Sequence, residues 1–164
     1  MQFIPKVGLR TLKTALAVFL CLLLFPATPF FACMTAVFCV QDTVSNSLKM
    51  AFVRGFGTIW GGLIGLVFLY ICRFVKGFAL PILLTTPIVY AIIAVGIIVV
   101  IQSLNLLQRS NCINIACIVF LAITTVNADK TPLIYTTNRV IETLFGVIIG
   151  LIVNRFIKPP KEPQ

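Results

Sequence analysis

The sequence contains no histidine, and only 10% of its 164 residues are charged. Without histidine, the chain cannot form Ser-His-Asp or Cys-His nucleophile pairs, HExxH zinc sites or haem ligands of the imidazole type. We therefore expect a protein that is not an enzyme and that holds no metal or cofactor. The shortage of charge, against about 25% in average soluble proteins, also leaves too little polar surface to coat a globule in water.

Acidic residues are especially few, since four Asp and Glu stand against thirteen Lys and Arg, which gives a formal net charge of +9. In a soluble protein this excess would suggest nucleic acid binding. Here nearly all the cations lie at the ends of apolar runs, where positive charge orients a membrane protein and meets anionic lipid headgroups. The expected partner is membrane lipid, with no nucleic acid.

Hydrophobic residues, in contrast, make up 60% of the chain and fall into six runs. Because a membrane-spanning helix needs about 20 residues, the runs predict an all-α, polytopic membrane protein with six transmembrane helices. The predicted helices are Thr14–Phe25, Phe30–Val44, Met50–Cys72, Leu80–Ile101, Cys112–Val126 and Leu133–Ile157. They form one transmembrane domain over residues 1–157, and a short polar cytoplasmic tail follows at 158–164.

The basic residues predict that both termini are cytoplasmic. With six spans, nine of the thirteen then lie on the cytoplasmic side, as the positive-inside rule requires. The nine are Lys6, Arg10, Lys13, Lys49, Arg54, Arg109, Arg155, Lys158 and Lys161, and the four on the other side are Arg73, Lys76, Lys130 and Arg139. We expect a multi-pass membrane protein.

Two segments of the chain share the pattern RxxxTxxGxxxG. The first copy has Arg54, Thr58, Gly61 and Gly65, and the second has Arg139, Thr143, Gly146 and Gly150. At 100° per residue these positions fall on one narrow helix face. If the third helix starts inside, the sixth starts outside, so the two copies predict an inverted repeat of three plus three helices, as in many transporters.

The glycines of this pattern, together with Gly57, have the small-xxx-small spacing that lets membrane helices approach closely, so we expect them to pack helices. The two arginines are candidate substrate-binding residues, because ionisable groups within a span usually face a cavity or a partner. Snorkelling to headgroups is the alternative for each arginine. Thr58 and Thr143, on the same faces, are candidate substrate contacts.

Two acidic residues are candidates for proton coupling or charge pairing. Asp42 and Glu142 could each titrate if desolvated, and either could then couple export to proton entry. Glu142 lies one turn after Arg139, so a structural ion pair is the alternative.

Four segments of the chain resemble the membrane domain of the aromatic acid exporter family. They are GLRTLKTALAV (Gly8 to Val18), PFFACMTAVFCVQDTVSNSLK (Pro29 to Lys49), RGFGTIWGGLIG (Arg54 to Gly65) and NRVIETLFGVIIGLIVN (Asn138 to Asn154). The resemblance implies a six-helix domain of the bacterial plasma (inner) membrane, similar to those of fusaric-acid-resistance transporters, that exports aromatic carboxylates and related anions.

The residues and the resemblance together predict a membrane exporter of small organic anions, expected as a homo-oligomer. Guanidinium is a planar, bidentate and permanently charged partner for a carboxylate, as such a substrate requires. The alternative function is a non-transporting membrane scaffold that associates with a partner through its glycine-rich helix faces.

Overall fold

The computed structural model describes residues 8–24, 29–77, 82–126 and 132–157. Within them all regular secondary structure is helical, as predicted. The elements are α1 (Leu9–Leu24), α2 (Phe30–Cys39), α3 (Val44–Gly77), α4 (Ile82–Leu106), the 3₁₀ turn η1 (Ser110–Cys112), α5 (Ile113–Leu121), the π-helical turn η2 (Ala122–Val126) and α6 (Pro132–Phe156). The predicted tail at 158–164, together with Lys6, Lys130, Lys158 and Lys161, lies outside the described residues.

Two helices begin earlier than the apolar runs predict. Helix α3 starts at Val44 rather than Met50, because the Thr43 hydroxyl accepts a hydrogen bond from the backbone N–H of Asn46 at 3.2 Å and caps the first turn. Helix α1 starts at Leu9 rather than Thr14, so its first turns carry basic residues. An apolar run marks the lipid-facing part of a helix, whereas capping decides where the helix begins.

In the part of the chain that the structure describes, three helices are long and apolar enough to cross a membrane: α3, α4 and α6. The others are shorter than the roughly 20 residues that a perpendicular span requires, since α1 has 16 residues, α2 has 10 and α5 has 9. Helix α5 is lengthened by η1 before it and η2 after it. The six-span topology therefore stays a prediction.

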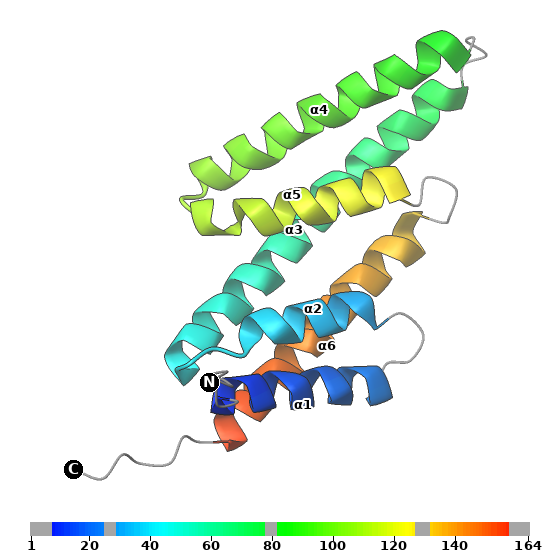
Figure 1. Ribbon diagram of the computed structural model, residues 1–164. Helices are drawn as coiled ribbons and strands as arrows, with labels where there is room; N and C mark the ends of the chain where they lie inside the picture. The colour runs from blue at the N-terminus through cyan, green and yellow to red at the C-terminus, as the bar shows by residue number, and fades with distance from the viewer. Residues whose placement is uncertain (1–7, 25–28, 78–81, 127–131, 158–164) are drawn as a thin grey trace, which may run out of the picture. The chain divides into compact units, whose positions relative to one another are not determined.

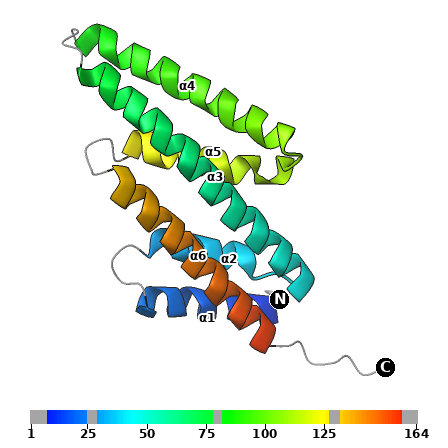
Figure 2. The same ribbon diagram turned by 180° about the vertical axis from the view of Figure 1, so that it is seen from behind.

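The chain divides into two compact units. The first combines Met1–Phe52 with Glu142–Gln164, and the second is Val53–Ile141. In the first unit α1 lies beside α2, which both views show (Figures 1 and 2). Small residues dominate its core and bring the helix backbones close together. This core consists of Ala17, Cys21, Ala32, Ala36, Val40, Ile149 and Val153.

The second unit has a larger apolar core, formed by α3, α4 and α5. Phe120 of α5 is fully buried and meets Phe68 of α3 edge to face, with ring centroids 5.6 Å apart. Gly96 of α4 leaves the space that the Phe120 ring occupies. A polar contact crosses the same core, where the Trp60 indole donates a hydrogen bond to the Ser103 hydroxyl at 2.9 Å.

Glycines on α3 and α6 allow their closest helix contacts. In the second unit, a Cβ added at Gly61 would clash with the backbone carbonyl of Ala116 on α5. In the first unit, a Cβ added at Gly146 would clash in the same way with the backbone carbonyl of Ala32 on α2. Each long helix therefore presses its glycine face against the backbone of a short helix, within the same unit.

The contacts one turn further on correspond as well. A Cβ at Gly65 would lie 3.4 Å from Phe120 Cα and Ile123 Cβ, and one at Gly150 would lie 3.4 Å from Ala36 Cα and 2.8 Å from Cys39 Cβ. Gly146 and Gly150 follow Gly61 and Gly65 by 85 positions. The residues that these glycines contact have nearly the same offset, since Ala116, Phe120 and Ile123 follow Ala32, Ala36 and Cys39 by 84 positions. One packing arrangement thus occurs twice in the chain.

Candidate functional site

The first predicted arginine lies inside the second unit. Arg54 of α3 is 4% exposed, and Thr58, one turn later on the same helix face, is 2% exposed. The Thr58 hydroxyl oxygen is buried without a hydrogen-bond partner in the described part of the chain. Burying a guanidinium is costly in any apolar surrounding, so the position of Arg54 is not that of a residue extended toward lipid headgroups.

The second predicted arginine lies against an aromatic ring. The guanidinium carbon of Arg139 is 4.6 Å from the centroid of the Tyr135 ring, one turn earlier on α6, which is a cation–π contact. Tyr135 itself packs into a small apolar cluster with Leu69 of α3 and Ile115 of α5. The half-buried arginine is therefore held from one side by a fixed aromatic face.

The remaining predicted site residues belong to the first unit. Glu142 is 2% exposed and Thr143 is 4% exposed, both on α6. Asp42 has a different environment, because its side chain is 71% exposed and pairs with Arg10 at 3.5 Å in the loop before α3. An ion pair at such an exposed position contributes little to stability.

The structure thus groups the predicted residues by unit. Arg54, Thr58 and Arg139 belong to the second unit, whereas Asp42 and Glu142 belong to the first. Within the described ranges no three His, Cys, Asp or Glu side chains lie close enough together to hold a metal ion.

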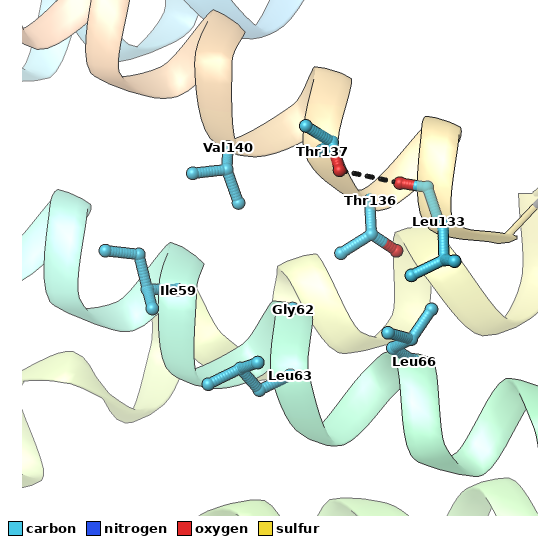
Figure 3. A pocket seen from close by; sticks show the side chains of 8 residues that line it. All are labelled: Ile59, Gly62, Leu63, Leu66, Leu133, Thr136, Thr137 and Val140. Carbon is cyan, nitrogen blue, oxygen red and sulfur yellow. Dashed lines mark hydrogen bonds between the residues drawn. The ribbon is translucent and has the colours of Figure 1, made fainter.

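A pocket of about 300 Å³ lies between the parts of α3 and α6 that belong to the second unit (Figure 3). Its walls are mainly apolar, and its polar groups come from α6. The lining residues are Ile59, Gly62, Leu63, Leu66, Leu133, Thr136, Thr137 and Val140. The Thr137 hydroxyl donates to the Leu133 carbonyl at 2.8 Å, while the buried Thr136 hydroxyl oxygen has no hydrogen-bond partner in the described segments. Arg139 directly precedes the lining residue Val140.

The first unit contains a polar cluster that the sequence analysis missed, formed by Lys13 of α1, Ser47 of α3 and Asn154 of α6. The three residues are 5%, 0% and 3% exposed. Lys13 Nζ donates to Asn154 Oδ1 at 3.1 Å, and Asn154 Nδ2 donates to Ser47 Oγ. The backbone N–H of Gln41 also donates to Ser47 Oγ, at 3.2 Å. We call these three side chains the Lys13 cluster.

The Lys13 cluster was missed because α1 was expected to begin at Thr14, which made Lys13 a flanking cation of the kind that meets headgroups. The helix in fact begins at Leu9, so Lys13 is its fifth residue. It shares a buried face with Ala17 and Cys21 at a spacing of four. That spacing of one lysine with two small residues is the sequence signal that would have placed Lys13 inside.

Comparisons with known proteins cover nearly the whole chain. The family model described as aromatic acid exporter family member 1 matches residues 5–157. A UPF0421 protein of Staphylococcus epidermidis is 28% identical over 158 residues, which are 94% of this chain and 44% of that protein. UPF0421 proteins of Staphylococcus haemolyticus and Halalkalibacterium halodurans are each 30% identical over 96% of this chain, and 45% and 41% of their own lengths are covered. The chain therefore spans less than half the length of these relatives. No solved structure is significantly similar to it.

Proposed function

The chain belongs to the aromatic acid exporter family, as the resemblance predicted, and on this basis we propose that it exports small organic anions, chiefly aromatic carboxylates, across the bacterial plasma membrane. The family match over residues 5–157 carries this proposal. Membership of a family of exporters is consistent with a transport role rather than catalysis, and the chain is a membrane protein with three long apolar helices.

Arg54 and Arg139 are the proposed partners of the substrate carboxylate. A guanidinium offers two parallel N–H donors to a carboxylate, and its attraction strengthens where water is excluded, as at the 4% exposed Arg54. Thr58 and Thr143 lie one turn beyond the two arginines and are both buried, so their hydroxyls are placed to add further hydrogen bonds. The burial of these residues supports a role in transport.

The pocket beside α6 is the proposed place for the aromatic ring. Its volume of about 300 Å³ is ample, because an apolar cavity of about 150 Å³ binds benzene. Leu63, Leu133 and Val140 offer apolar surface, and the Thr136 hydroxyl offers a polar group for a ring substituent. Since Arg139 follows Thr136 by three positions on α6, a carboxylate at the pocket would lie near its guanidinium.

Different roles are proposed for the two acidic candidates. Glu142 is 2% exposed and is the candidate for proton coupling, with a structural ion pair as the competing role. Asp42 is exposed and already pairs with Arg10, so charge pairing is its proposed role.

The proposed architecture is one transmembrane domain over residues 1–157, with six spans, cytoplasmic termini and an inverted repeat of three plus three helices. The matching contacts of Gly61 with Ala116 and of Gly146 with Ala32 support a repeat. Because three spans are an odd number, the second copy would enter the membrane in the opposite direction. Assembly into a homo-oligomer belongs to the same proposal.

The alternative function, a scaffold that binds a partner through its glycine faces, finds less support. Gly61 and Gly65 already pack against α5 and the η2 turn, and Gly146 and Gly150 already pack against α2. A partner would have to displace these helices to reach the glycines.

Efflux from proteoliposomes tests the proposed function. Vesicles that contain the purified protein are loaded with labelled benzoate and labelled mannitol, and protein-free vesicles provide the background. We expect benzoate to leave the protein-containing vesicles at least 10-fold faster than the background, and mannitol to be retained. Equal benzoate efflux with and without protein would favour the scaffold.

A pocket-filling variant tests where the ring binds. In Gly62→Leu the new side chain would extend from a backbone position whose Cβ has only ordinary contacts, at 3.4 Å from Thr136 Cγ2. We expect benzoate efflux to fall at least 10-fold while the variant elutes from size exclusion as the wild type does. Gly62→Ala, which leaves most of the pocket open, is the matched control and should retain efflux.

A further inference from the structure

The Lys13 cluster has more hydrogen-bond donors than acceptors. An ammonium has three N–H groups, a primary amide has two and a hydroxyl has one O–H. Within the described residues Lys13 uses one of its three, Asn154 uses one of its two, and Ser47 accepts two hydrogen bonds without donating one. The unused donors point to a missing acceptor, because buried polar groups are normally hydrogen-bonded.

The cluster also contains a buried positive charge. Lys13 is 5% exposed, and among the described side chains its one polar partner is the neutral amide of Asn154. A buried ammonium that lacks an opposite charge is costly, so a counter-ion would stabilise it. Arg10 and Asp42 form an ion pair on the surface of the first unit, and no carboxylate among the described residues pairs with Lys13.

The cluster lies at one end of the first unit, where α1 and α3 begin and α6 ends (Figures 1 and 2). Ser47 is in the first turns of α3, whose N-terminus has a partial positive charge. The exposed cations Arg10, Lys49 and Arg155 come from the same three helix ends, with Asp42 as the acidic residue beside them. This excess of positive charge attracts anions toward this end of the unit.

We propose that the Lys13 cluster is a carboxylate-binding site, in which one carboxylate accepts hydrogen bonds from Lys13 Nζ, Ser47 Oγ and Asn154 Nδ2. The carboxylate supplies both the acceptors and the negative charge that the cluster needs. That the anion is the exported aromatic acid rests on the proposed function. With cytoplasmic termini, the site would lie at the cytoplasmic end of the first unit, on the side from which an exported anion enters.

Equilibrium binding of labelled benzoate to the purified full-length chain in detergent tests the site. Lys13→Met keeps the length of the side chain but removes its charge, and we expect it to weaken benzoate binding at least 10-fold. Lys13→Arg should retain most of the affinity. Lys76→Met, which removes an exposed cation in the last turn of α3, is the matched control and should change the affinity by less than 2-fold.

Asn154→Asp tests the site without creating an unsatisfied group. It puts a carboxylate beside Lys13 Nζ, in place of the amide oxygen at 3.1 Å, and gives the Ser47 hydroxyl an acceptor. We expect this variant to melt at or above the wild-type temperature, to bind benzoate at least 10-fold more weakly, and to show a smaller thermal shift with benzoate than the wild type does. Lower stability together with wild-type binding would overturn the proposal, even if Lys13→Met fails to fold.

The outcomes separate this site from the proposed function. If the wild type binds benzoate through Lys13 but does not release it from proteoliposomes, the site stands and export fails. If it exports benzoate and the folded Lys13→Met and Asn154→Asp variants bind it unchanged, export stands and the site is overturned. Failure of the wild type to bind benzoate would overturn the site as well.

Discussion

At the scale of single residues, the chain buries several ionisable side chains although its sequence contains few of them. Lys13, Arg54 and Glu142 are 5%, 4% and 2% exposed, in a sequence with only 10% charged residues. Burying an ionised group away from water is costly unless it is paired or hydrogen-bonded. Apolar side chains at these positions would cost less free energy to bury, so we infer that these residues act on a substrate or on its coupling ion.

Arg139→Ala is expected to reduce benzoate efflux at least 10-fold while the protein remains inserted and folded. Its guanidinium rests on the Tyr135 ring, and Arg139 directly precedes the pocket residue Val140, so the substitution removes the cation that a carboxylate at the proposed site would meet. Proteoliposome efflux measures the loss, and membrane fractionation with size exclusion checks insertion and folding.

Lost activity in this variant has two explanations, because Arg139 and the buried Glu142 are one turn apart on α6. The double variant Arg139→Ala with Glu142→Gln removes both charges. Restored efflux in the double variant would mean that the arginine only compensated the acid. If the double variant is inactive, Glu142→Gln alone decides, since an active single variant leaves the arginine as the required group.

Two adjacent glycines of α3 are expected to respond oppositely to alanine. Gly61→Ala should lower the unfolding free energy by about 1–3 kcal/mol, because its Cβ would clash with the Ala116 backbone, which cannot rotate away. Gly62→Ala should raise it by about 0.5–1 kcal/mol, because the Cβ finds ordinary contacts and alanine favours a helix. Thermal unfolding in detergent measures both changes. A Gly61→Ala variant as stable as Gly62→Ala would show that α5 does not press on this face.

At the scale of helices, the two short helices α2 and α5 have equivalent roles, since each supports the glycine face of a long helix. Gly146→Ala should therefore be about as destabilising as Gly61→Ala, because its Cβ would clash with the Ala32 backbone just as that of Gly61 would with Ala116. The face of α3 that carries Gly62 points instead toward Thr136 of α6. Helix α3 thus packs against α5 with one face and lines the pocket with another.

Disulfide cross-linking tests the contact between α3 and the η2 turn that extends α5. In a background without native cysteines, Gly65→Cys with Ile123→Cys should form a disulfide on mild oxidation. A Cβ at Gly65 would lie 3.4 Å from Ile123 Cβ, close to the 3.5–4.5 Å that disulfides require. Protection from alkylation, read by mass spectrometry, measures the yield. Gly62→Cys with Ile123→Cys is the control and should remain reduced; cross-linking of both pairs alike would contradict the contact.

At the scale of the whole molecule, the chain corresponds to less than half of the longer relatives it matches. The two units share one packing arrangement, in which each long helix presses its glycines on a short helix. Both α3 and α6 contribute residues to both units, so the first unit combines two separate stretches of chain, whereas the second is the continuous stretch Val53–Ile141.

Both termini are expected to be cytoplasmic. Reporter fusions after Lys161 and beside Lys76 test this topology, with activity expected from a cytoplasmic reporter at the first position and from a periplasmic reporter at the second. The physical reason is the excess of basic residues on the cytoplasmic side under the six-span model. A periplasmic signal at the C-terminus would overturn both the six spans and the inverted repeat.

The helical class, the membrane environment and the family could all be predicted from the sequence. Composition and long apolar runs are local properties, and a chain with so few charges has no stable alternative to lipid. The pattern RxxxTxxGxxxG placed Arg54 and Thr58 on one face, because helix periodicity is fixed by backbone geometry. Helix ends were less predictable, since a single capping hydroxyl, that of Thr43, decides where α3 begins.

Only the tertiary structure decided which helices the glycine faces contact and which polar groups meet inside. Lys13 and Asn154 are 141 positions apart, and Asn154 and Ser47 are 107 apart, so no local pattern relates them. They meet because the small residues Ala17, Ala32 and Ala36 let α1, α2 and α6 approach closely. Local rules determine the helices, whereas the fit between their surfaces determines which side chains share a site.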